Sequence, residues 1–344
     1  MARGRKSNFS FSRLFSKDIA IDLGTANTLI WVMGQGIVVN EPSIVAKDVH
    51  TDKVIAVGNE AKEMLGKTHQ HIQTIRPLKD GVIADFEMAD GMIQGFIRKM
   101  HLSRLARPRM VICIPSGVTP VEQRAVRESA ERANAREVFL IEEPVAAAIG
   151  LGLDIAKPVG NIIVDIGGGT TEIAVIALNG IVTKEAIRVA GDELDDSIVE
   201  WFHNEHKMEL GYRTAERIKI EVGTGIVNHD TPVVIKGRDL VTGIPKTITV
   251  SPDEIRKAQA DTLHQIINAI KRALERTPPE LSADILDRGI ILTGGGALLK
   301  GLDKVIREET NLPVHVAEDP LTSVVRGTGM VLENIKKYSA IMLS

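Results

Sequence analysis

Two short stretches of this chain carry similar residue types in the same order, and their chemistry suits a phosphate group. The first runs from Ile21 to Ile30 and the second from Val164 to Ile173, so that Asp22 and Asp165 are 143 residues apart. Each is an apolar run that ends in Asp, followed by a turn of small residues and a second run of strand-forming residues. Because strand formers follow the glycines, both turns are predicted to be tips of β-hairpins.

The predicted tips supply many hydrogen-bond donors. The first contains Gly24, Thr25, Ala26 and Asn27, and the second contains Gly167, Gly168, Gly169 and Thr170. Their backbone N–H groups and polar side chains suit phosphate oxygens. The carboxylates of Asp22 and Asp165 would repel a phosphate, which indicates a bridging Mg²⁺ that keeps its waters. One such turn is more often a plain tight turn, but two copies favour a duplicated phosphate-binding hairpin.

A third glycine cluster has different surroundings. Residues 288–293 read as a strand, Gly294, Gly295 and Gly296 as a turn, and residues 297–306 as a helix. The positive end of that helix would suit an α-phosphate or a ribose. A turn needed only for packing explains the same residues equally well.

Glu143 and Pro144 mark the start of another predicted helix. Proline suits the first helical position and keeps the preceding residue extended, so Glu143 is predicted to be the N-cap. The positive end of the helix would favour its ionised form. Glu143 would then orient a water better than it would accept a proton, and hydrolysis would be slow. An ordinary helix cap is the alternative.

Glu216 and Lys219 are three residues apart in a short helical run, residues 214–223. This spacing places them on one helix face. A solvated ion pair is the simplest interpretation of the two residues taken alone.

The elements between these motifs alternate as in an α/β protein. Residues 109–115 and 138–141 read as strands, and between them Thr119, Pro120 and Glu122 form a capping-box helix start. This is one right-handed crossover unit. With 344 residues and 44% hydrophobic content, the chain can form two halves with separate cores. Short β-like runs in 233–250 indicate a smaller subdomain.

Five strings in this order resemble one known superfamily. They are Asp22 to Thr28, Asp80 to Phe86, Ile141 to Gly150, Asp165 to Glu172 and Leu292 to Leu299. Together with Glu216 and Lys219 they resemble the actin, Hsp70 and sugar-kinase ATPase superfamily, and within it the MreB family of bacterial actins. The resemblance runs from about residue 18 to about residue 333.

The resemblance implies a duplicated actin-like α/β fold with the nucleotide between two halves. The expected division is a tail at 1–17, a first half at 18–157 and a second half at 158–344. Smaller subdomains are expected at about 44–86 and 193–258, and a C-terminal helix at about 322–338 is expected to pack back towards the first half.

The resemblance also implies roles for individual residues. Gly24 to Asn27 and Gly167 to Thr170 would hold the β- and γ-phosphates of ATP, and Asp22 and Asp165 would position Mg²⁺ through water. Glu143, with Thr170 nearby, would orient the hydrolytic water. Glu216, Lys219 and the turn of Gly294, Gly295, Gly296 and Ala297 would hold ribose and adenine.

The function implied is that of an ATP-dependent filament at the inner face of the bacterial membrane. Its expected partners are further copies of the chain, the anionic membrane surface and cell-wall elongation proteins, and its expected role is to maintain rod shape. A formal net charge of −3 gives no indication of general nucleic-acid binding.

Other residues bear on the compartment. The single cysteine, Cys113, lies in an apolar strand and cannot form an internal disulfide, which agrees with a reducing cytoplasm. No stretch reaches the roughly 18 apolar residues that a membrane span needs. His69 and His71 are far in sequence from any Cys or acidic metal spacing, so we expect surface residues and no protein-ligated metal.

The first 17 residues are basic and aromatic. They contain five Lys or Arg residues and no acid, and Phe11, Leu14 and Phe15 share one helical face near Phe9. The segment lacks the continuous apolar core of a signal peptide. A peripheral membrane anchor and a disordered tail both fit this composition. Leu102 and Leu105 in the basic loop 101–109 are a second expected insertion point.

Two other functions use the same nucleotide clamp. A small-molecule kinase would need a base that receives the acceptor's proton, and a capped Glu143 would serve poorly. An Hsp70-type chaperone would need a peptide-binding domain, and Ser344 follows the third glycine cluster too closely to leave room for one.

Overall fold

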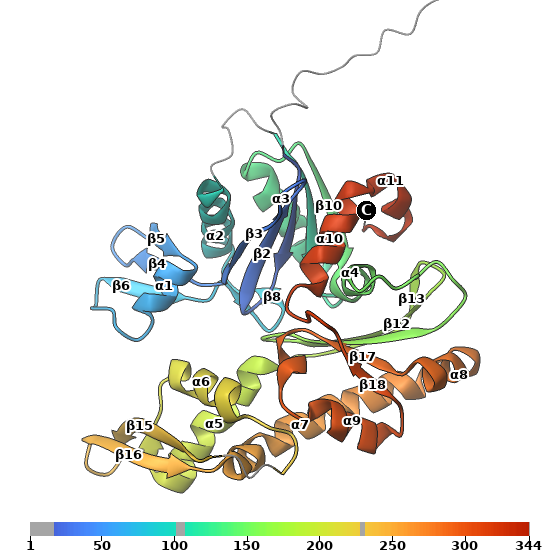
Figure 1. Cartoon of the computed structure of the whole chain (residues 1–344). Coiled ribbons are helices and arrows are strands. Elements are labelled where there is room, and N and C mark those ends of the chain that lie inside the picture. The colour runs from blue at the N-terminus through green and yellow to red at the C-terminus, as the bar shows by residue number, and fades with distance from the viewer. Residues whose placement is uncertain (1–16, 101–106, 228–230, 344) are drawn as a thin grey trace, which may run out of the picture.

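The computed structural model describes residues 17–100, 107–227 and 231–343. Two five-stranded sheets lie one above the other with helices between and outside them, and a smaller lobe projects beside each sheet (Figure 1). The residues expected at the membrane, Phe9, Phe11, Leu14, Phe15, Leu102 and Leu105, lie outside the described residues.

The first sheet has the strand order β10-β9-β1-β2-β3. Strands β1, β2 and β3 form an antiparallel meander, and β9 and β10 add parallel to β1. The strands are β1 (Ile19–Leu23), β2 (Asn27–Val32), β3 (Gly36–Pro42), β9 (Arg109–Ile114) and β10 (Glu137–Glu142). The helices of this half are α2 (Phe86–Lys99), α3 (Pro120–Arg132) and α4 (Glu143–Gly150).

The second sheet repeats the first. Its order, β13-β12-β11-β17-β18, has the same antiparallel meander and the same two parallel strands beside it. The strands are β11 (Asn161–Ile166), β12 (Thr171–Ala177), β13 (Gly180–Ile187), β17 (Ile290–Thr293) and β18 (Val314–Val316). The helices are α5 (Gly191–His206), α7 (Pro252–Glu275), α8 (Pro279–Arg288) and α9 (Leu302–Thr310). The duplicated hairpins therefore belong to duplicated sheets.

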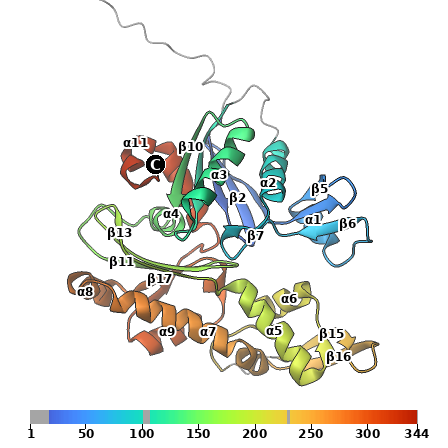
Figure 2. The ribbon, with the colours of Figure 1, turned by 180° about the vertical axis from the view of Figure 1, so that it is seen from behind.

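The cores follow the layers seen in Figures 1 and 2. One core packs the first sheet against α2 and α3, and another packs the second sheet against α7, α8 and α9. A third core lies between the sheets, where α4 and α10 (Ser323–Glu333) meet strands of both halves. Buried Val111 of one sheet and Ile163 of the other belong to it. The alternation of elements thus produces an α/β/α/β/α stack.

Two smaller lobes complete the fold. Beside the first sheet, β4 (Val45–Asp48), β5 (Val54–Val57) and β6 (Ile72–Ile75) form a sheet with α1 (Asn59–Met64). A short hairpin follows, β7 (Leu78–Lys79) and β8 (Val82–Ile83). Beside the second sheet, β14 (Met208–Glu209), β15 (Val233–Asp239) and β16 (Pro245–Val250) pair, and α6 (Tyr212–Val222) packs against α5.

Helices α4 and α10 approach backbone to backbone between the two sheets. A Cβ on Gly150 would lie 1.9 Å from the carbonyl oxygen of Ser323, and one on Gly327 would lie 1.7 Å from that of Ala146. Only glycine fits such a contact. The helix expected over 322–338 is interrupted at Asn334, where α10 ends before the short α11 (Ile335–Tyr338); a final turn, η3 (Ser339–Ile341), follows.

The helix predicted for residues 297–306 is wrong in its start. The glycine cluster leads into a single 3₁₀ turn, η2 (Gly295–Leu298), and α9 begins only at Leu302. Leu299 is extended and Gly301 has a φ of 75°, and this left-handed backbone breaks a continuous helix. The glycine cluster is therefore not the N-terminus of α9, and the positive end of that helix does not lie at the cluster.

Thr119 caps α3 as predicted, with the reciprocal capping box to Glu122. Cys113 is buried and free, as expected. Among the described residues, none of the helices combines the length and the apolar character that crossing a bilayer requires.

Candidate functional site

The two predicted hairpins form, and their tips touch. Asp22 pairs with Leu29 across the first hairpin, and Asp165 pairs with Glu172 across the second. A Cβ on Gly168 would lie 2.6 Å from the Cβ of Ala26, so the second tip packs directly on the first. The two Asp-tipped loops therefore face one another across the boundary between the sheets.

A cavity of about 500 Å³ opens beside these tips. Most of the predicted site residues line it: Asp22, Gly24, Thr25, Ala26, Asn27, Glu143, Asp165, Gly167, Gly168, Thr170, Glu216, Lys219, Gly294, Gly295 and Gly296. The structure therefore brings together five motifs that are scattered over the sequence.

Two predicted residues are not among those lining the cavity. Gly169 packs against the Asp80 backbone and the Thr25 methyl group, since a Cβ there would lie 2.9 Å from each. Ala297 is 3% exposed and belongs to the core under the second sheet. Gly169 thus lets another loop approach the second tip, and Ala297 anchors the glycine turn.

That other loop is the turn of the β7–β8 hairpin, Asp80 and Gly81. Both residues have positive φ, 51° and 75°, which defines a two-residue type I′ turn. The Gly81 N–H donates to Thr25 Oγ1 at 3.2 Å, and a Cβ on Gly81 would lie 2.6 Å from the Thr170 methyl carbon. A third hairpin therefore packs against the tips of both duplicated hairpins. The Asp-Gly pair is itself a hairpin signal in the sequence, but its target is set by tertiary packing.

Three carboxyl groups line the cavity, those of Asp22, Asp165 and Glu143, and Glu172 is buried beside Asp165, its partner across the second hairpin. Burial, with a smaller contribution from the charge of Asp165, raises the pKa of Asp22 to about 7. Burial likewise raises the pKa of Asp165 to about 7. Glu172 also has its pKa raised to about 7 by burial, although it accepts hydrogen bonds from the Ser116 N–H at 2.9 Å and hydroxyl at 2.7 Å. Burial thus disfavours the ionised form of Asp22, Asp165 and Glu172.

Glu143 differs from its prediction in two ways. The N-cap of α4 is Glu142, and Glu143 is the first helical residue. Burial, reinforced by the charges of Glu172, Asp22 and Asp165, raises the pKa of Glu143 well above its usual value. The predicted ionisation by the helix end is therefore wrong, because desolvation and the neighbouring carboxylates outweigh the helix field.

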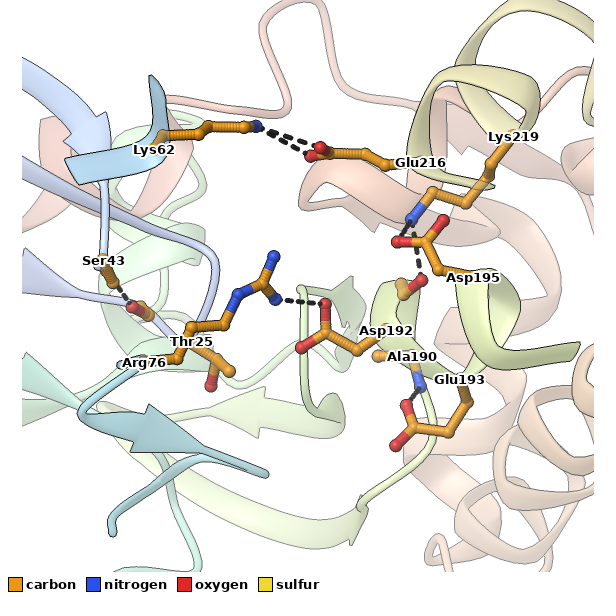
Figure 3. Close-up of polar contacts among 12 residues, drawn as sticks. Thr25, Ser43, Lys62, Arg76, Ala190, Asp192, Glu193, Asp195, Glu216 and Lys219 are labelled. Carbon is orange, nitrogen blue, oxygen red and sulfur yellow. Dashed lines mark hydrogen bonds and ion pairs between the residues drawn. The ribbon is translucent and has the colours of Figure 1, made fainter. Parts of the chain in front are cut away.

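Glu216 and Lys219 do not pair with each other, and both have partners elsewhere (Figure 3). Lys219 donates to the Asp195 carboxylate at 2.9 Å and to the Gly191 carbonyl at 2.7 Å. Glu216 accepts from Lys62 of the first half at 3.0 Å. The simple reading as a mutual surface pair is therefore wrong, since the two side chains turn to different elements.

The sequence analysis does not predict several charged residues that line the cavity and pair with residues far away in the sequence. Arg76 Nη1 lies 3.0 Å from Asp192 Oδ1 on α5. The Asp192 N–H donates to the Gly168 carbonyl at 2.7 Å, which places the start of α5 against the second hairpin. Lys62 and Asp195 also line the cavity. None has a local signal, because each partner is remote in the sequence.

His69 and His71 are exposed, as expected, and His71 has a histidine neighbour. Its Nδ1 lies 2.7 Å from His50 Nε2 on the exposed edge of the small first lobe. Across the described ranges, no group of three His, Cys, Asp or Glu side chains is arranged to hold a metal ion by itself.

Comparison with known proteins identifies the family. The model of the MreB/Mbl protein family matches residues 16–340. The cell shape-determining protein Mbl of Bacillus subtilis is 52% identical over 96% of this chain and 100% of its own length. The cell shape-determining protein MreB of Escherichia coli K12 is 50% identical over 97% of this chain and 98% of its own.

Solved structures agree on the fold. The crystal structure of MreB5 of Spiroplasma citri bound to AMPPNP superposes with a TM-score of 0.90, at 39% identity over 94% of this chain and 98% of that one. The MamK double helical filament superposes with a TM-score of 0.79 at 22% identity, which supports the actin-like fold alone. The chain therefore belongs to the MreB/Mbl family of actin-like cell shape-determining proteins.

Proposed function

We propose that the chain binds ATP with Mg²⁺ in the cavity between its halves and assembles into an actin-like filament. The observation that carries this proposal is the contact of the two duplicated hairpin tips, Gly168 on Ala26, beside one cavity. The MreB5 relative bound to AMPPNP, at a TM-score of 0.90, supports the choice of nucleotide. The division at 18–157 and 158–344 is part of the proposal and is supported by the matching order of the two sheets.

The site residues are assigned by their positions around the cavity. The tips at 24–27 and 167–170 would hold the β- and γ-phosphates through backbone N–H groups. Glu216, Lys219 and the 294–296 turn lie further along the cavity and would hold ribose and adenine. Ala297 would support that turn from the core.

The buried carboxyls fit the Mg²⁺ that accompanies a triphosphate. Asp22 and Asp165 stand before the two tips, burial disfavours the charge of both, and the charge of Asp165 adds to this at Asp22. Both are therefore suited to hold the waters of Mg²⁺, which would neutralise phosphate charge.

Hydrolysis is assigned to Glu143 with Thr170, which line the same cavity. Glu143 would accept a hydrogen bond from the attacking water, and its raised pKa makes it a competent base once it is ionised. Glu143 is therefore no argument against a kinase, because it is not the N-cap and its pKa is raised. What disfavours a kinase is instead the similarity to cell shape-determining proteins, which are 52% and 50% identical over nearly the whole chain. Slow turnover rests on the family resemblance.

The deciding experiment compares polymer formation by wild type and Glu143→Ala with ATP, with ADP and without Mg²⁺. Light scattering should rise with ATP and Mg²⁺, and the polymers should persist longer in the variant because ATP is not hydrolysed. A wild type that stays monomeric at high concentration, with or without lipid, and consumes ATP faster when sugars are added would support the kinase instead.

We place the filament at the inner face of the cell membrane, where it would guide cell-wall elongation and maintain rod shape. The basic and aromatic residues 1–17 support this location, since each basic residue near an anionic surface contributes about 1 kcal/mol. A filament carries many tails, so attachment would depend on assembly through effective concentration. Deleting 1–17 should release ATP-assembled protein from anionic vesicles, and unchanged co-sedimentation would contradict the anchor.

A further inference from the structure

Two ion pairs join residues that line the cavity from opposite halves (Figure 3). We propose that Lys62–Glu216 and Arg76–Asp192 form a latch that holds the halves together and sets the rate at which nucleotide leaves. This inference rests on the proposed nucleotide site and adds a determinant of exchange to it.

The geometry of both pairs depends on closure. Lys62 Nζ on α1 lies 3.0 Å and 3.1 Å from the two carboxylate oxygens of Glu216 on α6. Arg76, which follows β6, reaches the first turn of α5 at Asp192, 3.0 Å away. The partners are 154 and 116 residues apart in the sequence, so neither pair is imposed by local structure. Both form only while the two halves lie close together.

In both ion pairs, each half of the protein contributes charges of one sign. Both cations come from the first half, and both carboxylates come from the second. Among the residues that the structure describes, these are the two ion pairs that join 44–86 to 190–258. The latch is therefore the electrostatic link between the small first lobe and helices α5 and α6.

All four residues line the cavity, so they lie beside a bound nucleotide, and pairs that hold the two halves together around it would slow its release. They are also partly exposed, with 29% to 40% of each side chain accessible. Exposed pairs are individually weak and screened by salt. Such pairs can break and re-form without unfolding the lobes, as a latch requires. Removing one pair should speed release by about threefold, and removing both by roughly tenfold.

A second consequence concerns Glu216, the proposed ribose ligand. Lys62 holds its carboxylate from the opposite side of the cavity. Losing Lys62 would therefore free Glu216 to change rotamer as well as weaken closure. Arg76 has no such second role in the proposal, so Arg76 variants report on closure more directly.

The test is stopped-flow release of a fluorescent ATP analogue, with Mg²⁺, from Lys62→Met, Arg76→Met and the double variant. The matched control is Lys47→Met, because Lys47 pairs with Asp52 within the small first lobe and does not cross the cavity. The single variants should release about threefold faster and the double about tenfold faster, while Lys47→Met should match wild type. Raising salt should speed wild type more than the double variant. A double variant that releases the analogue at the wild-type rate would overturn the latch.

A second measurement does not need nucleotide. Spin labels at Glu63→Cys on α1 and Arg213→Cys on α6, both exposed, report the separation of the lobes, and the native Cys113 is buried. Without nucleotide, the double variant should show a longer and broader distance distribution than wild type, and an unchanged distribution would overturn the proposal. Failure of wild type to bind the analogue would count against the proposed function alone, because the distances still decide whether the latch exists.

Discussion

Replacing Gly168 with alanine should weaken nucleotide binding without weakening the fold of either half. The added Cβ would lie 2.6 Å from the Ala26 Cβ and 3.1 Å from the Ala26 nitrogen. Gly168 is not one of the glycines with positive φ, so alanine can adopt its backbone conformation. The cost therefore arises only where the two halves meet, and opening the cleft relieves it.

The size of the effect follows from the overlap. A contact under 3.0 Å forces one backbone tip to move, and forced packing of this kind costs about 1–3 kcal/mol. If the cost is paid only in the closed, nucleotide-bound form, affinity for ATP should fall by roughly 5- to 150-fold. The melting temperature without nucleotide should stay close to that of wild type.

Isothermal titration calorimetry with ATP and Mg²⁺ measures the loss, and a double-mutant cycle assigns it to the contact. Ala26→Gly removes the atom at 2.6 Å, so Gly168→Ala with Ala26→Gly should recover most of the affinity. Gly117→Ala is the control, because its Cβ meets no atom within 4 Å. Wild-type affinity in Gly168→Ala, or a loss that Ala26→Gly does not reduce, would refute the meeting of the two tips.

Three further changes test other parts of the structure. Burial raises the pKa of Asp195 to about 6 from 3.8, so its ionisation opposes folding and the free energy of unfolding should fall as pH rises from about 4 to about 6. When pH is lowered from 7 to 5, the free energy of unfolding measured in urea should rise by roughly 1 kcal/mol less in Asp195→Asn than in wild type. Thr119→Ala removes the capping box at the start of α3 and should cost about 1 kcal/mol in the same assay. Gly327→Ala should destabilise the protein by at least about 1–3 kcal/mol, since its Cβ would lie 1.7 Å from the Ala146 oxygen, and a stability equal to wild type would contradict the α4–α10 contact.

The sequence predicts this fold well where the signal is local and repeated. Both hairpins, the crossover with its Thr119 cap and the buried Cys113 follow from residue type and spacing. The structure that follows the glycine cluster at 294–296 is less predictable from the sequence. Its apolar spacing reads as a helix from 297, yet Gly301 with positive φ delays α9 to Leu302. A glycine's φ is set by the packing around it, and residue type alone leaves it open.

The site was predictable as a set of motifs but not as a network of charges. Pro144 located the start of α4 to within one residue, but it gave no measure of the burial that raises the pKa of Glu143. Lys62 and Arg76 carried no signal at all, because their partners on α5 and α6 come close only after both halves fold. Burial and long-range pairing are properties of the tertiary structure, so spacing within one segment cannot reveal them.

The two halves share a fold and differ in the charges they present to each other. Around the cavity both halves contribute acids, Asp22 and Asp165, whose burial disfavours their charge. In the two ion pairs between the halves, one half contributes cations and the other carboxylates, which attract. A bound cation would remove the repulsion between the acids while the ion pairs keep the halves together. Opposing terms of this kind allow an open and a closed form of similar free energy, and a ligand that binds the closed form better can then shift the population.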